Sequence, residues 1–272
     1  MRLDLYLFEN GYAESRQRAK VLIDAGQVYI DGVQRTKASF AVPAGDVSVE
    51  IRGEVMPYVG RGGYKMAGML EGFSVDPTGF VCVDIGASTG GFTDCLLQNG
   101  AARVYAVDSG TDQLAQKLRD DDRVVVMEQF NARALDESYT GGRVDLCVCD
   151  VSFISITKIF EPVTRVLSDY DPATKAGSFL ALIKPQFEAG KEHIGKGGIV
   201  RDKKVYLRVI TDVIRAAEEW GLYCVSVLPS PIVGGDGNRE FLAHFAHKAP
   251  TAANRALLER NCLLNIIDSA DA

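Results

Sequence analysis

The 272-residue chain lacks several features that would assign it to a broad class of protein. No segment approaches the ~18 apolar residues that a membrane-spanning helix requires, and the first residues do not have the pattern of a signal peptide. Positive charge is not in excess, because 30 Lys+Arg stand against 36 Asp+Glu and give a formal net charge of −6. Any nucleic-acid-binding surface must therefore be a local patch. These absences predict a cytoplasmic protein without a membrane segment.

The spacing of the cysteines indicates neither a disulfide framework nor a metal site. The six cysteines form no CxxC pair and no regular framework, and most lie within apolar segments such as LCVCD. We therefore expect reduced, buried thiols in a cytosolic protein, with neither disulfides nor a metal site.

From residue 80 onward, apolar segments alternate with helical patterns. The segments are almost continuously apolar, as in buried parallel strands; they are FVCVDI, RVYAVD, RVVVME, VDLCVCD, SFLALIKP, LYCVSVLP and EFLAHFA. Helical patterns such as GFTDCLLQNG, ISITKIFEPVTRVLSD and KKVYLRVITDVIRAAEEWG lie between them. The alternation predicts an α/β fold of the Rossmann-like type, with a mostly parallel, doubly wound seven-stranded sheet. Ligands bind such sheets beyond the carboxyl ends of the strands.

The organisation of the sequence changes near residue 58. The first part has two helical patterns and a hairpin signal; Ser15 is a candidate N-cap, Gly26 a helix stop, and Asp31-Gly32 a hairpin turn. The segment MPYVGRGGYK, rich in glycine, predicts a linker. The predicted parts are a small α/β domain at 1–58, a linker at 59–64, the large domain at 65–248 and a helical C-terminal tail at 249–272.

The first domain resembles the small RNA-binding domain shared by ribosomal protein S-four, pseudouridine synthases and tyrosyl-tRNA synthetases. The resemblance rests on the first apolar helix, the Ser-Arg helix and the G-x-V-x-x-D-G hairpin. In that domain the second helix and the hairpin face RNA. This implies RNA contacts for Arg16, Arg18, Lys20, Arg35 and Lys37. A solvated helix face is the alternative, since residues 1–60 carry seven Lys+Arg and eight Asp+Glu, a net charge of −1.

A glycine cluster follows the first strand of the large domain. The segment VDIGASTGGFTD has the form D-x-G-x-x-x-G-G and lacks the second glycine of the G-x-G-x-x-G dinucleotide fingerprint. A ligand without a pyrophosphate relaxes the need for that glycine, so the form favours S-adenosylmethionine over a dinucleotide. Asp108 ends the next strand, 22 positions after Gly86, where an acid can accept hydrogen bonds from both ribose hydroxyls of a nucleoside.

The predicted cofactor site combines this cluster with the ends of neighbouring strands. We expect Asp84 to face the ammonium group of the cofactor, and Gly90 and Gly91 to let its methionine end approach the backbone. Gln129 and Asn131 could address the adenine edge or could be ordinary loop residues. The full predicted set is Asp84, Gly86, Ala87, Ser88, Gly90, Gly91, Phe92, Asp108, Gln129, Asn131 and Asp150.

Four charged residues lie at or before strand ends. Asp150 ends the fourth strand, Lys184 ends the fifth, Glu240 begins the last, and Lys65 precedes the first. Buried charges are costly unless they are paired, so a structural ion-pair network is the alternative to a functional site. The N/D-P-P-Y/F loop of amine methylation is absent, and so is the Pro-Cys pair of cytosine carbon methylation.

The whole chain is similar to the TlyA family, the hemolysin-like ribosomal RNA methyltransferases with an FtsJ-type domain. The similarity lies in RLDLYLFENGYAESRQRAKVLIDAG, GRGGYK, VDIGASTGGFTD, CDVSFIS, LIKPQFE, GKGGIVRD and SPIVGGDGNREFL. It implies S-adenosylmethionine as cofactor, ribose 2′-hydroxyls as acceptors and ribosomal RNA or a ribosomal subunit as partner. The family's Lys-Asp-Lys-Glu tetrad falls on Lys65, Asp150, Lys184 and Glu240. Lys184 could take the hydroxyl proton as a neutral amine or polarise the oxygen as a cation.

Two other functions belong to different classes. The name hemolysin suggests a pore-forming protein, but no apolar span and no exposed basic amphipathic helix support it. A non-catalytic RNA-binding protein that acts in ribosome assembly would retain the fold for structural reasons alone. The presence of all four tetrad residues favours the enzyme.

Overall fold

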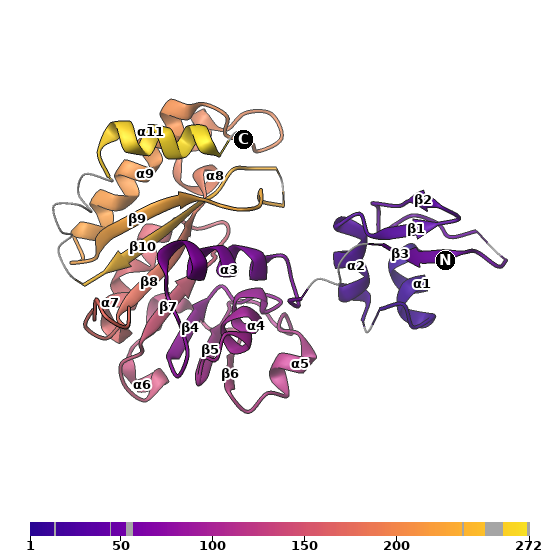
Figure 1. Cartoon of the computed structure of the whole chain (residues 1–272), viewed down its shortest axis with the longest axis horizontal. Coiled ribbons are helices and arrows are strands. Elements are labelled where there is room, and N and C mark those ends of the chain that lie inside the picture. Colours follow the sequence, from indigo (N-terminus) through magenta and orange to yellow (C-terminus); the bar gives the residue numbers. More distant parts are fainter. Residues whose placement is uncertain (14, 44, 53–56, 236, 248–257, 271–272) are drawn as a thin grey trace. The chain divides into compact units, whose positions relative to one another are not determined.

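The computed structural model of the chain consists of two compact units, Met1–Arg61 and Gly62–Ala272 (Figure 1). It describes residues 1–13, 15–43, 45–52, 57–235, 237–247 and 258–270. The predicted end of the first domain adjoins residues 53–56, and the predicted C-terminal tail begins on residues 249–257. Both stretches lie outside the described residues.

The small unit folds around one apolar core. Its elements are α1 Leu3–Glu9, α2 Arg16–Asp24, β1 Val28–Ile30, β2 Val33–Gln34 and β3 Val49–Ile51. The strands form an antiparallel sheet in the order β2-β1-β3. Leu3 and Leu7 from α1, Ile23 from α2, and Val28 and Ile30 from β1 are almost completely buried. The helical and strand periodicities of the sequence thus place their apolar residues in a common core.

Three local features of the small unit confirm the sequence predictions. The Ser15 hydroxyl oxygen accepts a hydrogen bond from the Arg18 backbone N–H at 3.1 Å and caps α2. Gly26 follows the helix with φ of +69°, the left-handed conformation that glycine adopts without strain. Asp31 and Gly32 have φ of +51° and +77°, as a two-residue hairpin turn between β1 and β2 requires.

The large unit contains a seven-stranded sheet. Its strands are β4 Val81–Ile85, β5 Arg103–Val107, β6 Val124–Met127, β7 Leu146–Cys149, β8 Ser178–Ile183, β9 Tyr223–Pro229 and β10 Phe241–Ala246. Their order is β6-β5-β4-β7-β8-β10-β9. Strands β4 to β8 pair in parallel, whereas β10 pairs antiparallel with both β8 and β9. This topology confirms the predicted doubly wound, mostly parallel sheet.

Helices cover both faces of the sheet. The α-helices are α3 Gly62–Phe73, α4 Gly91–Gln98, α5 Gln116–Arg119, α6 Glu137–Thr140, α7 Phe160–Val166, α8 Pro185–Glu188, α9 Lys203–Glu218 and α11 Arg260–Ser269, and the 3-10 helices are η1 Ala132–Ala134, η2 Ile156–Lys158 and η3 Lys191–His193. Alternate strand residues such as Val83, Cys147 and Phe179 share one core with α7, α9 and α11. Helix α3 lies against β9, where a Cβ added at Gly72 would be 2.4 Å from Leu228 Cδ1.

Two segments differ from the sequence predictions. Helix α3 begins at Gly62, so Gly62 and Gly63 of the predicted linker form its first turn. The helical pattern ISITKIFEPVTRVLSD divides into η2 and α7. Pro162 lies in the first turn of α7, where a missing N–H removes no helical hydrogen bond.

The strand order places an opening at the centre of the sheet. From β4 the chain proceeds to β5 and β6 on one side, and then to β7 and β8 on the other. The connections that follow β4 and β7 therefore leave in opposite directions. A crevice forms at such a switch point, outside the carboxyl ends of the strands.

Candidate active site

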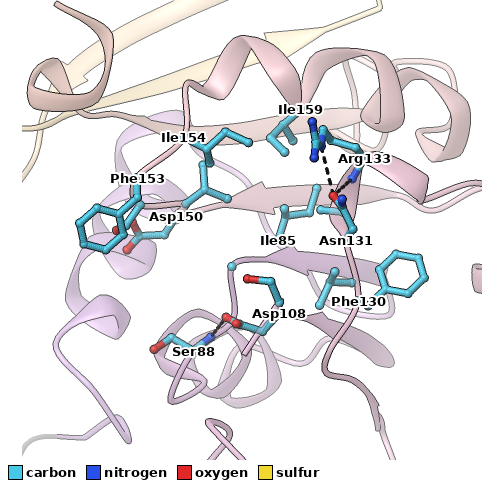
Figure 2. Close-up of a pocket in the computed structure, with 16 residues that line it drawn as sticks. Ile85, Ser88, Asp108, Phe130, Asn131, Arg133, Asp150, Phe153, Ile154 and Ile159 are labelled. Carbon is cyan, nitrogen blue, oxygen red and sulfur yellow. Dashed lines mark hydrogen bonds between the residues drawn. The ribbon is translucent and has the colours of Figure 1, made fainter. Parts of the chain in front are cut away.

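A cavity of about 400 Å³ lies at the carboxyl ends of β4, β5 and β7 (Figure 2). Its wall consists of residues that end or follow these strands, together with the segment after β6. They are Ile85, Gly86, Ser88, Val107, Asp108, Ser109, Phe130, Asn131, Ala132, Arg133, Asp150, Val151, Ser152, Phe153, Ile154 and Ile159. Of the residues predicted to bind the cofactor, Gly86, Ser88, Asp108, Asn131 and Asp150 are in this wall.

Backbone geometry explains two glycines of the cluster. Gly86 has φ of +84°, and a Cβ there would lie 2.9 Å from the carbonyl oxygen of Asp150. Gly90 has φ of +93°, and a Cβ there would lie 2.2 Å from Leu118 Cδ1. Gly86 is thus required where β4 meets β7, whereas Gly90 makes room for an apolar side chain. Four predicted residues of the cluster are buried outside the cavity wall: Ala87, Gly90, Gly91 and Phe92.

Asp108 is held in the cavity wall by two backbone donors. Its Oδ2 accepts a hydrogen bond from the Ser88 N–H at 2.8 Å, which Figure 2 shows, and its Oδ1 accepts one from the Gly110 N–H at 2.7 Å. Each carboxylate oxygen can accept a further hydrogen bond. The orientation of Asp108 therefore suits an acid that binds a pair of ribose hydroxyls.

Asp84 lies in β4, directly before the glycine cluster, and is fully buried. Its Oδ2 accepts hydrogen bonds from the Thr93 N–H at 3.0 Å and from the Thr93 hydroxyl at 2.7 Å. Its Oδ1 has no hydrogen-bond partner among the residues that the structure describes. The pKa of Asp84 is raised to about 7, chiefly by burial and less by the charges of Asp150 and Asp108, against the opposing effect of the Thr93 hydrogen bonds.

The carboxyl groups around the cavity fit a positively charged ligand. Asp84, which lies behind the wall next to Ile85, has a buried oxygen without a hydrogen-bond partner among the described residues, and Asp108 and Asp150 lie in the wall. A nearby positive charge stabilises an ionised carboxylate, and a buried carboxylate gains most from it. S-adenosylmethionine carries a sulfonium and an ammonium group. The residues of the cavity therefore fit the predicted cofactor.

The four charged residues at the strand ends form one connected group. Lys65 Nζ lies 2.6 Å from Glu240 Oε2 and 3.5 Å from Asp150 Oδ2, and Lys184 Nζ lies 2.5 Å from Asp150 Oδ1. Lys65, Lys184 and Glu240 are 8%, 7% and 4% exposed, whereas Asp150 lines the cavity. Two cations and two carboxylates balance in charge, as a buried ionic group requires.

The antiparallel direction of β10 brings Glu240 into this group. Lys184 directly follows β8, and Glu240 directly precedes β10. Because Phe241 pairs with Ile183, the amino end of β10 lies beside the carboxyl end of β8. If β10 ran parallel to β8, Glu240 would lie at the opposite end of the strands, beside the amino end of β8.

The structure adds Ser152 to the predicted residues. Lys184 Nζ donates a hydrogen bond to Ser152 Oγ at 2.9 Å, and Ser152 lines the cavity near Asp150. The next residue, Phe153, has φ of +65° and is 92% exposed. Both residues belong to the segment CDVSFIS, but their residue types alone do not reveal that the serine contacts a buried lysine.

The residues predicted for adenine lie in different surroundings. Gln129 is outside the cavity wall and has φ of +54° at a bend in the backbone. Asn131 is in the wall, but its Oδ1 already accepts hydrogen bonds from the Arg133 backbone N–H at 3.1 Å and from its Nε at 3.3 Å (Figure 2). Phe130 and Ile159, which the sequence analysis missed, supply apolar surface to the wall.

Among the predicted RNA contacts of the small unit, Arg16 has a second role. Its guanidinium lies 2.8 Å from Asp4 Oδ2, and the guanidinium of Arg2 lies 2.9 Å from Asp4 Oδ1. Asp4 is fully buried. The hydrogen bonds from Arg2 and then Arg16 hold the pKa of Asp4 well below its usual range. Arg16 therefore stabilises a buried charge, which the prediction of a pure RNA contact did not include.

The other predicted RNA contacts also differ in their surroundings. Arg18 donates a hydrogen bond to a backbone carbonyl oxygen of the same unit at 3.0 Å, and the Arg35 guanidinium lies 4.2 Å from the centre of the Phe40 ring. Lys20, on α2, and Lys37, after the hairpin, are exposed. The two lysines are thus the members of the predicted set best suited to contact phosphates.

Two features are absent from the described ranges, a membrane-spanning helix and a metal-binding cluster. Residues 1–270, apart from the gaps noted above, contain no helix that is both long enough and apolar enough to cross a membrane. The same residues contain no group of three or more His, Cys, Asp or Glu side chains arranged to hold a metal ion.

Comparisons with known proteins agree with this architecture. The FtsJ-like methyltransferase family matches residues 58–247, and the S4 domain family matches residues 1–48. The chain is 43% identical to the 16S/23S rRNA (cytidine-2′-O)-methyltransferase TlyA of Mycobacterium tuberculosis, over 88% of this chain and 87% of that protein. It is 41% identical to Hemolysin A of Brachyspira hyodysenteriae, over 90% and 99% of the two chains. A solved structure of a hemolysin-named protein from Streptococcus thermophilus is 38% identical, with a TM-score of 0.76 and coverage of 100% of this chain and 95% of that one.

Proposed function

The chain belongs to the TlyA family of FtsJ-like methyltransferases, and from this premise we propose that it methylates ribose 2′-hydroxyls of ribosomal RNA with S-adenosylmethionine. The observation that carries the proposal is the group formed by Lys65, Asp150, Lys184 and Glu240 at the cavity. Three of its members are buried and one is open to the cavity. Such a group can orient a hydroxyl and accept its proton.

The cavity provides each part of the cofactor with a suitable surface. S-adenosylmethionine supplies an electrophilic methyl group on a sulfonium sulfur. Asp108 would accept hydrogen bonds from the cofactor's ribose hydroxyls, and the carboxyl groups of Asp84 and Asp150 would favour its positive charges. Phe130 and Ile159 offer apolar surface for the adenine ring.

Asp150 is the member of the tetrad that we assign as proton acceptor, because it lines the cavity. S-adenosylmethionine held in the cavity would supply the methyl carbon to which the ribose oxygen bonds, and its sulfur would be the leaving group. As the oxygen forms this bond, its proton becomes strongly acidic, so a carboxylate is a sufficient base. Alignment of the reacting atoms can lower the barrier by roughly 7–11 kcal/mol.

The two lysines fix Asp150 from both sides. Lys65 lies near Oδ2 and Lys184 near Oδ1, so the carboxylate cannot rotate without losing an ionic contact. Lys184 Nζ is in contact with Asp150 Oδ1 and donates a hydrogen bond to Ser152 Oγ, which are the contacts of a donor rather than of a proton acceptor. Of the two roles that the sequence left open, we therefore propose that Lys184 polarises the reacting hydroxyl as a cation.

In this proposal the small unit contributes most of the affinity for RNA. Neutralisation of phosphates dominates the affinity of proteins for nucleic acids, and a chain of net charge −6 needs a local cationic surface. The exposed Lys20 and Lys37 provide part of that surface within the S4 domain match. The printed name of the M. tuberculosis relative leads us to propose cytidine in ribosomal RNA, alone or within a subunit, as the target.

The test is a methylation assay with labelled S-adenosylmethionine, followed by nucleotide mapping of the product. Free ribosomal RNA and each ribosomal subunit are incubated with the wild type, Asp150→Asn, Lys184→Ala and the control Lys204→Ala, an exposed lysine on α9. We expect label in 2′-O-methylcytidine with the wild type and the control, and none with the two tetrad variants. Label on a base, or no transfer to any particle by a protein that binds the cofactor, would contradict the proposal. The second result would favour a non-catalytic assembly protein.

A further inference from the structure

Ser152 lies between a buried lysine of the tetrad and the open cavity. Lys184 is 7% exposed and donates a hydrogen bond to Ser152 Oγ at 2.9 Å, whereas Ser152 is exposed and lines the cavity wall. We propose that Ser152 is a further catalytic residue, which orients the ribose 2′-oxygen by donating a hydrogen bond from its hydroxyl. This inference rests on the proposed function.

The hydrogen-bonding capacity of the reacting oxygen leaves one place for such a donor. A ribose hydroxyl has one proton and two lone pairs on its oxygen. One lone pair forms the bond to the methyl carbon, and the proton goes to Asp150. The second lone pair can accept a hydrogen bond. Because Ser152 Oγ accepts from Lys184 Nζ, its own proton points away from that nitrogen and is available as the donor.

The contact with Lys184 strengthens Ser152 in this role. A hydroxyl that accepts a hydrogen bond from a cation becomes a better donor, since successive hydrogen bonds polarise one another. A lysine that is 7% exposed can thereby act on an oxygen in the cavity without entering it. In this arrangement Lys184 acts on the substrate oxygen through the Ser152 hydroxyl.

The loop that carries Ser152 is anchored to α8 by hydrogen bonds beyond Phe153. Glu188 of α8 accepts hydrogen bonds from the Ser155 hydroxyl at 2.7 Å and from the Ile156 N–H at 2.8 Å. Between these contacts and Ser152, Phe153 has φ of +65°, a left-handed conformation that non-glycine residues rarely adopt. Strained backbone of this kind persists where surrounding contacts enforce it, and it is found at functional sites.

A purely structural serine would behave differently in an activity measurement. If Ser152 only held Lys184, its removal would change the ionic surroundings of the tetrad and shift the pH dependence of the reaction. If Ser152 contacts the substrate oxygen, its removal lowers the maximal rate and leaves the pH midpoint in place. The two roles therefore separate in a pH–rate profile.

The experiment compares full-length wild type with Ser152→Ala, Ser152→Thr, Ser152→Cys and Ser138→Ala, the last an exposed serine on α6. Single-turnover transfer to ribosomal particles is measured across pH with saturating cofactor, and cofactor and RNA affinities are measured separately. For Ser152→Ala we expect a plateau rate lower by about 10–100-fold, as for a reacting oxygen that is no longer held in its attacking orientation. The pH midpoint and both affinities should stay unchanged. Ser152→Thr, which keeps the hydroxyl, should retain most of the rate, and Ser138→Ala all of it.

Three results would overturn the inference: a wild-type plateau in Ser152→Ala, a shifted pH midpoint with an unchanged plateau, or a loss of rate explained by weaker cofactor or RNA binding. If Ser152→Ala does not fold, Ser152→Cys decides, because a thiol is a weak donor of similar size. A wild type that methylates no 2′-hydroxyl would refute the proposed function and this inference together. An active wild type with an equally active Ser152→Ala would refute the inference alone.

Discussion

Among single residues, Asp84 has the clearest consequence for ligand binding. Its pKa is raised to about 7 by burial, so near neutral pH part of the population carries a proton on this carboxyl. A cationic ligand beside it lowers that pKa. Binding of S-adenosylmethionine at about pH 6.5 should therefore release protons, and affinity should rise with pH until it levels above about pH 7. Calorimetry in two buffers with different ionisation enthalpies measures the proton release.

The control for this prediction is Asp84→Asn, which removes the titrating group and nearly preserves the shape. In this variant the observed binding enthalpy should lose the part of its buffer dependence that Asp84 contributes. Affinity should fall by about 1–3 kcal/mol, the range for a lost charged hydrogen bond in a buried site. Identical proton release in wild type and variant would show that Asp84 does not respond to the cofactor.

His244 predicts a pH dependence of folding. It lies in β10, is 2% exposed, and contacts Ser178 Oγ through Nε2 at 2.8 Å. Burial, and then the charge of Lys175, lower its pKa from 6.5 to about 4. Between these values the unfolded chain binds a proton and the folded chain does not. The stability that neutral His244 contributes is therefore present above about pH 6.5 and is lost as pH falls toward 4, by about 3 kcal/mol at most.

Urea unfolding at pH 7 and pH 4.5 tests this effect, with His244→Gln as the comparison. The wild type should lose about 2–3 kcal/mol more stability between the two pH values than the variant does. A comparison of variants is needed because Asp84 acts in the opposite direction: its raised pKa makes the folded state relatively more stable as pH falls below 7. Equal pH dependence in the two proteins would contradict the assignment to His244.

Among single residues, the sequence predicted the charged residues of the tetrad, but not the contacts that Ser152 and Asp4 make. Asp150 and Lys184 could be identified because charges at the ends of apolar strands need partners, and parallel strands bring their carboxyl ends together. Lys65, which lies in α3, was included in the tetrad through the family resemblance. The contact of Ser152 with Lys184 depends on the direction of one side chain in an irregular loop. The pairing of Arg16 with Asp4 depends on how two helices pack. Neither geometry is encoded in residue type or spacing.

Among the secondary-structure elements, α8 anchors the loop between β7 and η2 through hydrogen bonds to Glu188. Glu188 satisfies a hydroxyl and a backbone N–H of that loop, and burial raises its pKa. Glu188→Ala should leave both donors without their partner, loosen residues 150–156 and weaken cofactor binding by about 1–3 kcal/mol. Glu188→Gln, whose amide oxygen can still accept, should have a smaller effect. Hydrogen exchange of residues 150–156 and calorimetry provide the measurements.

The matched control is Glu161→Ala, because Glu161 is an exposed carboxylate on α7. It should change neither hydrogen exchange of the loop nor cofactor affinity. Unchanged exchange of residues 150–156 in Glu188→Ala would mean that the loop does not depend on α8.

Strands and long helices were predictable from the sequence, and short helices were not. The seven strands stand out because buried parallel strands are almost continuously apolar, and α9 stands out by its amphipathic pattern. Helices α5 and α6 and the 3-10 turns have only three or four residues each, too few to establish a periodicity. The start of α3 was misplaced because two glycines, which usually indicate a loop, form its first turn.

For the whole molecule, we predict a division of labour between the two units. Replacement of Lys20 and Lys37 together by Ala should raise the apparent KM for ribosomal RNA and flatten its salt dependence, because each lost phosphate contact reduces counterion release. Cofactor affinity and the maximal rate should not change. Methylation assays at several salt concentrations, with calorimetry for the cofactor, measure these quantities. Wild-type KM and salt dependence in the double variant would place the RNA contact elsewhere.

Arg16→Ala is a necessary comparison in that experiment. Arg16 holds the buried carboxylate of Asp4, so its loss should lower the thermal stability of the small unit as well as any RNA affinity. Lys20 and Lys37 are exposed, and their replacement should leave the melting temperature unchanged. The two kinds of variant thus separate a loss of RNA contact from a loss of folding.

The antiparallel place of β10 also has a consequence for protein synthesis. Lys65 and Glu240, which are in contact, are 175 positions apart in the chain (240 − 65). The ribosome must therefore synthesise the chain through Glu240 before the tetrad can close. A nascent chain that already contains the glycine cluster, or a fragment cut anywhere between these two positions, lacks the assembled set. Assembly of the tetrad therefore requires that synthesis has passed Glu240.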